Sequence, residues 1–102
     1  MDYITKTLGV PVIRAEWKQQ VSLPFFLNDR YTFEQADVGG VACLIVHPVE
    51  ELDTINTLKK HVARLHAASG RQVVFELTAI SRQRRNSFID AKLAFVVPEK
   101  QV

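Results

Sequence analysis

The stretch that decides the fold is "ACLIVHPVEELDTINTLKKHVARLHAASGRQVVFEL", from Ala42 to Leu77. Two short apolar runs, Ala42–Val46 and Val73–Leu77, are rich in the β-branched and aromatic residues that are typical of strands. The segment between them, Thr54–Ser69, carries apolar residues at helical spacing instead. The stretch therefore predicts a strand–helix–strand unit, and because such crossovers are almost always right-handed, its two strands should lie parallel in one sheet.

Both ends of the predicted helix have recognisable signals. Asp53 is expected to be the N-cap, because its carboxylate can accept hydrogen bonds from the free amides of the first turn. Gly70 supplies the left-handed residue that ends a helix. The residues expected to face the core are Ile55, Leu58, Val62 and Leu65.

Downstream of this unit, the sequence predicts a second helix and a third strand. Ser81 can cap a helix of about ten residues, whose inner face would carry Phe88, Ile89 and the stem of Arg85. The apolar run Leu93–Val97 then predicts another strand.

Upstream, the sequence predicts a β-hairpin. Within Tyr31–Ala36, Tyr31, Phe33 and Gln35 alternate with Thr32 and Glu34. The "DVGG" that follows at Asp37–Gly40 provides two glycines that can take positive φ. We expect Tyr31–Ala36 to be an antiparallel strand at the edge of the sheet. Before it, "VPVIRAEW" (Val10–Trp17) suggests a further strand, and "LPFFL" (Leu23–Leu27) an apolar loop held open by its proline.

The expected fold is therefore α/β, with a small, mostly parallel sheet built from a β-hairpin followed by α-β-α-β, and an antiparallel edge strand. Two short helices cover little of a sheet with four or five strands. If both lie on one face, the other face needs Trp17, Phe25 and Phe26, or a second chain. We expect both, with these three residues at a protein interface and the chain forming a homodimer.

Length and composition are those of a single globular domain over residues 1–102. The chain is 47% hydrophobic and 24% charged, with a net charge of +2. Its apolar runs are too short for a membrane helix, and its first residues lack the pattern of a signal peptide. One cysteine cannot form an intrachain disulfide, so we expect a cytoplasmic protein without membrane attachment.

Ligands of open parallel sheets bind at the carboxyl ends of the strands. Here those ends offer His47, Thr78 with Ser81, and Pro98 with Glu99. The turn between Leu77 and Ser81 has no glycine, which disfavours a dinucleotide or P-loop site. We therefore expect no cofactor.

Metal-dependent catalysis finds little support in the sequence. Glu16 with Lys18, and Asp90 with Lys92, have the bare acid-x-lysine spacing of metal nucleases, but a second acid on a neighbouring strand is missing. Glu76, the one acid within a core-like run, is more simply expected to pair with a lysine or arginine. The remaining metal and nucleophile candidates also have simpler explanations. His61 and His66 do not share a helix face, and His47 is expected to cap a strand end or face solvent. Cys43 is expected to be a buried hydrophobic residue. We expect no metal and no catalytic residue.

The basic stretch "SRQRRNSFID" leaves more than one interpretation open. Arg82, Arg84 and Arg85 lie at the start of the predicted helix, where positive charge opposes the helix macrodipole. They can form a solvated face or a contact to another protein. Together with Lys92, they can also contact nucleic acid or another anion.

Three long runs support a resemblance to a known family: "LPFFLNDRYTFEQADVGGVACLIVHP", "LDTINTLKKHV" and "VVFELTAISRQRRNSFIDAKLAFVVPEKQV". Together with "ITKTLGVPV" and "EWKQ", they resemble the N-terminal region of uncharacterised MarR-like winged-helix transcription regulators of Gram-positive bacteria. The resemblance spans nearly the whole chain but rests on packing and turn residues, so it transfers no functional residue.

In those proteins a winged-helix DNA-binding domain follows, and this chain lacks it. The final "PEKQV" also resembles the turn of a hairpin whose return strand has just begun. We therefore expect an N-terminal fragment of a longer regulator. The resemblance implies a non-catalytic accessory domain that dimerises, senses an effector or docks a partner, with DNA contacted through the missing domain. Direct nucleic-acid binding by Arg82, Arg84 and Arg85 is the alternative, and a metal-dependent nuclease-like domain is a third.

Overall fold

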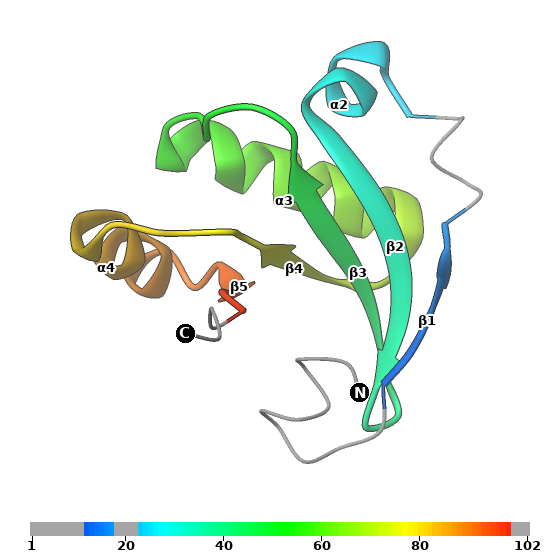
Figure 1. The fold of residues 1–102 in the computed structure, drawn as a ribbon. Helices are drawn as coiled ribbons and strands as arrows, with labels where there is room; N and C mark the ends of the chain where they lie inside the picture. Colours follow the sequence, from blue (N-terminus) through cyan, green and yellow to red (C-terminus); the bar gives the residue numbers. More distant parts are fainter. Residues whose placement is uncertain (1–11, 18–22, 99–102) are drawn as a thin grey trace.

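The computed structural model describes residues 12–17 and 23–98 and shows an α/β fold. Within these residues it has a five-stranded sheet and three helices (Figure 1). In chain order the elements are β1 (Val12–Glu16), α2 (Phe25–Arg30), β2 (Tyr31–Val38), β3 (Val41–Pro48), α3 (Ile55–Ser69), β4 (Gln72–Glu76), α4 (Arg82–Asp90) and β5 (Ala94–Val96). The closing "PEKQV" hairpin, except for Pro98, lies outside the described residues.

The sheet is mixed and mostly antiparallel, so the expectation of a mostly parallel sheet is wrong. Its strand order is β1-β2-β3-β4-β5. The β3–β4 and β4–β5 pairs are parallel, as the strand–helix–strand units predict, but they align only four and three residue pairs. The antiparallel pairs β1–β2 and β2–β3 align five and eight. The N-terminal meander thus supplies most of the pairing.

Strand β2 lies inside the sheet, not at its edge. The predicted hairpin is confirmed: Val38 pairs with Val41, and Gly39 and Gly40 between them have φ of 57° and 86°. Positive φ at both turn residues matches the twist of two-residue hairpins. The strand predicted within Val10–Trp17 also exists as β1, and because it pairs with β2, it takes the edge position expected for Tyr31–Ala36.

The two predicted helices are confirmed, with one change of cap. Thr54, not Asp53, is the N-cap of α3, since its side chain accepts from the amide of Thr57. Gly70 ends α3 in the left-handed conformation, with φ of 67°. Ser81 caps α4 as expected and accepts from the amide of Arg84.

The segment "LPFFL" is not a loop throughout, because it enters a third helix. Pro24 is the N-cap of α2, and its carbonyl accepts from the amide of Leu27 at 3.0 Å. Proline has a fixed φ and no backbone N–H, and the amides at a helix start have no partner within the helix, so proline is compatible with this turn. Leu27 is fully buried, which ties the short helix to the core.

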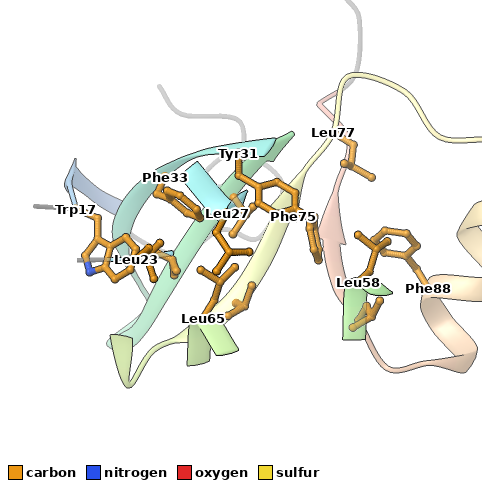
Figure 2. Close-up of a cluster of buried hydrophobic side chains, with 14 residues drawn as sticks. Trp17, Leu23, Leu27, Tyr31, Phe33, Leu58, Leu65, Phe75, Leu77 and Phe88 are labelled. Carbon is orange, nitrogen blue, oxygen red and sulfur yellow. The ribbon is translucent and has the colours of Figure 1, made fainter. Parts of the chain in front are cut away.

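All three helices lie on the same face of the sheet. Leu27 of α2, Leu58 and Leu65 of α3 and Phe88 of α4 join one buried cluster. The strand residues in this cluster alternate along the chain, as one face of a sheet requires; they are Tyr31 and Phe33, Leu44 and Val46, Val73 and Phe75. Figure 2 shows these side chains meeting between the strands and helices.

The core explains two further departures from expectation. Trp17 packs edge-on against Phe33, with ring centroids 5.4 Å apart, so it lies on the helix-covered side and not on the open face. In α4, Phe88 is fully buried, but Ile89 is 59% exposed and Arg85 is also exposed. Residues 88 and 89 differ by about 100° around a helix, so only one of them can face the sheet.

The opposite face carries a smaller apolar cluster of Ala36, Cys43 and Ile45, all buried, flanked by Val38, Val74 and Val96. None of its members belongs to a helix in the described part of the chain. No helix among the described residues is long and apolar enough to cross a membrane.

Candidate functional site

A pocket of about 370 Å³ lies at the carboxyl ends of β3 and β4. This is where open parallel sheets usually bind ligands, and we call it the strand-end pocket. It is formed by the end of β3 with the loop that follows, the end of β4 with the loop that follows, and the first turn of α4. Its lining residues are His47, Pro48, Glu50, Glu51, Leu52, Glu76, Leu77, Thr78, Ala79, Ile80, Ser81 and Arg84.

Backbone hydrogen bonds position both loops. The amide of Val49 donates to the carbonyl of Arg30 at 3.0 Å, which fixes the chain as it leaves β3. The amide of Leu77 donates to the carbonyl of Val96 at 2.9 Å, which holds the end of β4 against β5. Three residues that the sequence places at strand ends, His47, Thr78 and Ser81, therefore line one pocket.

Arg84 joins the two halves of the pocket. Its guanidinium donates to the carbonyl of Leu52 at 2.9 Å, linking α4 to the β3–α3 loop across 32 positions of sequence. This contact accounts for a cation in a helix's first turn, where the macrodipole opposes it. Of the arginine cluster, Arg84 is half-buried and lines the pocket, whereas Arg82 and Arg85 are exposed and do not.

The wall formed by β3 and β4 belongs to a charged network across four strands. Arg14 of β1 donates from one nitrogen to Oε1 of Glu34 at 2.9 Å and to Oε2 of Glu76 at 2.8 Å. His47 Nε2 lies 2.7 Å from the same oxygen of Glu34. The expectation that Glu76 pairs with a basic residue is confirmed, and its partner comes from the opposite edge of the sheet. His47 is half-buried and bonded, so it is not merely a solvent-facing residue.

The pocket can recognise groups of both charges. Glu50, Glu51 and Glu76 supply carboxylates, while Arg84 supplies a guanidinium. Thr78 and Ser81 add hydroxyls, which both donate and accept. The apolar part of the lining comes from Pro48, Leu52, Leu77, Ala79 and Ile80.

The other predicted contact residues lie elsewhere. Lys92 is exposed at the turn after α4, where it has an uncommon positive φ of 58°, and it lines a separate pocket with Val62 and His66. Trp17 is 1% exposed, so in this structure it has almost no surface to offer a partner. Phe26 is 43% exposed but contacts the ring of His61 and the guanidinium of Arg64. The side chain of Phe25 lies outside the described residues.

His61 belongs to the core, facing α2 and β2. Its Nδ1 lies 2.7 Å from the hydroxyl of Tyr31, and both residues are buried. Burial lowers the pKa of His61, and burial, with a smaller contribution from Asp53, raises the pKa of Tyr31 to about 12. His66 instead donates from Nδ1 to the carbonyl of Arg71. The two histidines therefore point to different surroundings, as their spacing predicts.

The remaining titratable candidates offer no cluster for metal chemistry. Among the described residues, no group of three or more histidines, cysteines, aspartates or glutamates is placed to hold an ion. Cys43 is buried, and burial raises the pKa of its thiol. Glu16 and Asp90 are both exposed, whereas Lys18 lies outside the described residues.

Sequence reasoning missed Arg14 and the pair Glu50–Glu51 as parts of this region. Arg14 is the single cation in "VIRAE", an otherwise weakly polar strand, and that position was the only local signal for it. Glu50 and Glu51 look like ordinary loop acids, and their place at the pocket depends on contacts distant in sequence.

Comparison with known proteins adds no identification. The chain matches no family model, no curated protein and no solved structure.

Proposed function

We propose that this chain is a non-catalytic accessory domain of a bacterial transcription regulator, and that it acts by sensing an effector. The observation that carries the sensing role is the strand-end pocket, which lies at the carboxyl ends of the strands, where ligands of such sheets bind. The resemblance to the N-terminal region of MarR-like regulators supports the regulatory context, in which a winged-helix domain contacts DNA. The proposed setting is the cytoplasm.

The contacts around the pocket favour binding over reaction. Glu34 and Glu76 share one cation, Arg14, and His47 is held by Glu34. Arg84 is similarly held by the carbonyl of Leu52. Fixed charges of this kind orient a ligand, and because Arg84 and Glu76 belong to different elements, an occupant can alter how α4 sits against the β3–α3 loop.

Chemical-shift mapping of the isotopically labelled chain tests the sensing role. Titration with a library of small polar molecules is expected to give saturable shifts at the amides of Thr78 and Ala79, and no shifts at distant amides such as Gly39. A library that shifts no pocket amide would contradict effector sensing. Shifts confined to the second pocket, near Val62 and Lys92, would contradict its location.

Direct nucleic-acid binding stays as a second proposal, since Arg82, Arg85 and Lys92 are all exposed. Affinity for duplex DNA is then expected to fall steeply with salt, because phosphate contacts release counterions. The double substitution Arg82→Gln/Arg85→Gln should weaken binding and reduce the salt slope. Weak binding without a salt slope would exclude this proposal.

We also propose that the chain forms a homodimer. Light scattering of the purified chain is expected to give twice the mass of one chain. A single-chain mass over the whole accessible concentration range would reject it.

A further inference from the structure

We infer that the strand-end pocket takes a small zwitterion, a molecule with both an ammonium and a carboxylate group, of which free α-amino acids are the simplest class. This inference rests on the proposed sensing function and adds the chemistry of the ligand. It is carried by the pocket's pairing of opposite charges within one small volume.

The ammonium is assigned to the acidic side of the pocket. Glu50 and Glu51 follow β3 and are exposed, so they are free to turn toward a bound cation. Glu76 is fixed by Arg14 through Oε2, and among the described residues Oε1 has no hydrogen-bond donor. A fixed carboxylate with one unengaged oxygen is suited to accept from an ammonium group.

The carboxylate is assigned to the side formed by α4. Arg84 uses one terminal nitrogen for the carbonyl of Leu52, and a guanidinium has further donors that can bind a carboxylate. The hydroxyl of Ser81 lies on the same side, at the first turn of α4, where the helix dipole favours negative charge. The bond to Leu52 fixes the direction of the guanidinium, so less side-chain entropy is lost on binding.

Size and charge balance exclude the neighbouring ligand classes. A volume of about 370 Å³ is at the lower end of the range for small-molecule sites, about 300–1,000 Å³. A phosphate-rich ligand would meet three carboxylates, and a polyamine would meet the guanidinium of Arg84. A zwitterion satisfies both sides, and Leu77 and Ile80 leave apolar surface for its side chain.

Chemical-shift titration with matched probes tests the inference. Each of the twenty standard L-amino acids is titrated into the labelled chain, and L-leucine is compared with 3-methylbutylamine, which lacks the carboxylate, and 4-methylpentanoate, which lacks the amine. At least one amino acid is expected to saturate the shifts at Thr78 and Ala79. The amine-only and acid-only analogues of the amino acid that binds best should bind at least about tenfold more weakly.

Substitutions at the two sides provide the second arm. Arg84→Gln, and separately Glu50→Gln/Glu51→Gln, should each lower the affinity for that amino acid by about tenfold or more. Arg82→Gln, an equivalent change just outside the pocket, should leave it unchanged. The glutamates are exposed, so their variant is expected to keep the wild-type spectrum away from the pocket even if Arg84→Gln disturbs folding.

The outcomes separate the two proposals. If no amino acid binds but 3-methylbutylamine or 4-methylpentanoate alone shifts the pocket amides, the zwitterion inference is overturned and the sensing role stands. If neither these probes nor the polar library shifts those amides, the zwitterion inference and the sensing role are both overturned. Amino-acid binding that survives both pocket variants also overturns the inference.

Discussion

The guanidinium of Arg14, on edge strand β1, lies 2.8 Å from Oε2 of Glu76, three strands away on β4. The two residues are 62 positions apart, and their side chains are only 22% and 20% exposed. The two side chains therefore extend toward each other over β2 and β3, on the face that carries no described helix, and join both halves of the sheet.

This pair should be energetically coupled. Arg14→Met is expected to lower the free energy of unfolding by about 2–4 kcal/mol, because it leaves two half-buried carboxylates without their cation. A double-mutant cycle with Glu76→Gln, measured by urea denaturation, should give a coupling of about 1–2 kcal/mol. The more exposed Arg30–Asp53 pair is the control, with an expected coupling below about 1 kcal/mol. Equal couplings would show that the reach across the sheet adds nothing.

Arg84 should stabilise the fold as well as line the pocket. Arg84→Ala is expected to cost about 1–2 kcal/mol, since it removes a charged donor from the carbonyl of Leu52. Arg82→Ala, at an exposed position of the same turn, should stay within about 0.5 kcal/mol. Chemical denaturation of the two variants is the measurement, and equal effects would contradict the structural contact.

The apolar stripe of α3 can be tested at a fully buried position. Leu58 is completely buried, so Leu58→Ala is expected to cost about 2–4 kcal/mol by lost burial and the cavity left behind. Lys59→Ala, at the exposed neighbouring position, should change stability by less than about 0.5 kcal/mol. Urea denaturation of the two variants, with m-values equal to that of the wild type, gives both changes in the free energy of unfolding.

His61 should make stability depend on pH in a definite direction. Its pKa is lowered in the folded chain, chiefly by burial, whereas the unfolded chain titrates near 6.5. As the pH falls through about 6.5, the unfolded state binds the proton first, so the free energy of unfolding decreases toward the folded pKa. The measurement is the urea midpoint between pH 8 and 5.

Two comparisons isolate His61. His61→Phe should flatten this part of the profile, and His66→Gln, at an exposed position of the same helix, should not. Direct titration of the His61 ring by NMR gives an independent value. A ring pKa at or above 6.5 would contradict the burial argument.

Cys43 should resist thiol reagents in the folded chain. It is 5% exposed, and its pKa is raised by burial, so both access and thiolate formation are disfavoured. Labelling with a chromogenic disulfide at neutral pH is expected to be slow until urea unfolds the chain. Fast labelling without urea would mean that the face carrying Ala36 and Ile45 opens readily.

The elements that the sequence predicts well are those whose signals are local. The apolar spacing of α3, the paired glycines of the β2–β3 turn and the apolar run of β4 all depend on residues within one element. The small helix α2 was missed because its proline, read as a breaker, is here a helix start. The burial of Phe88 in place of Ile89 depends on how α4 docks, which its own residues do not fix.

The sheet type and the pocket depend on distant contacts. The predicted β2–β3 hairpin already makes the sheet mixed, and β1 adds a second antiparallel pair by pairing with β2. One weakly patterned strand such as β1 gives no indication of its partner. The strand-end location of His47, Thr78 and Ser81 could be predicted from the general rule for parallel strands. The contributions of Arg14 and Glu50 could not, because loop conformation and reach across the sheet determine them.

The strand order β1-β2-β3-β4-β5 has a consequence for how the domain can assemble. Each strand lies beside the one that precedes it in the chain, so no strand has to be threaded between two that are already paired. During synthesis the strands can join the sheet in the order in which they leave the ribosome, because each new strand pairs with the one before it. Only the ion pair between Arg14 of β1 and Glu76 of β4 must wait until β4 has formed.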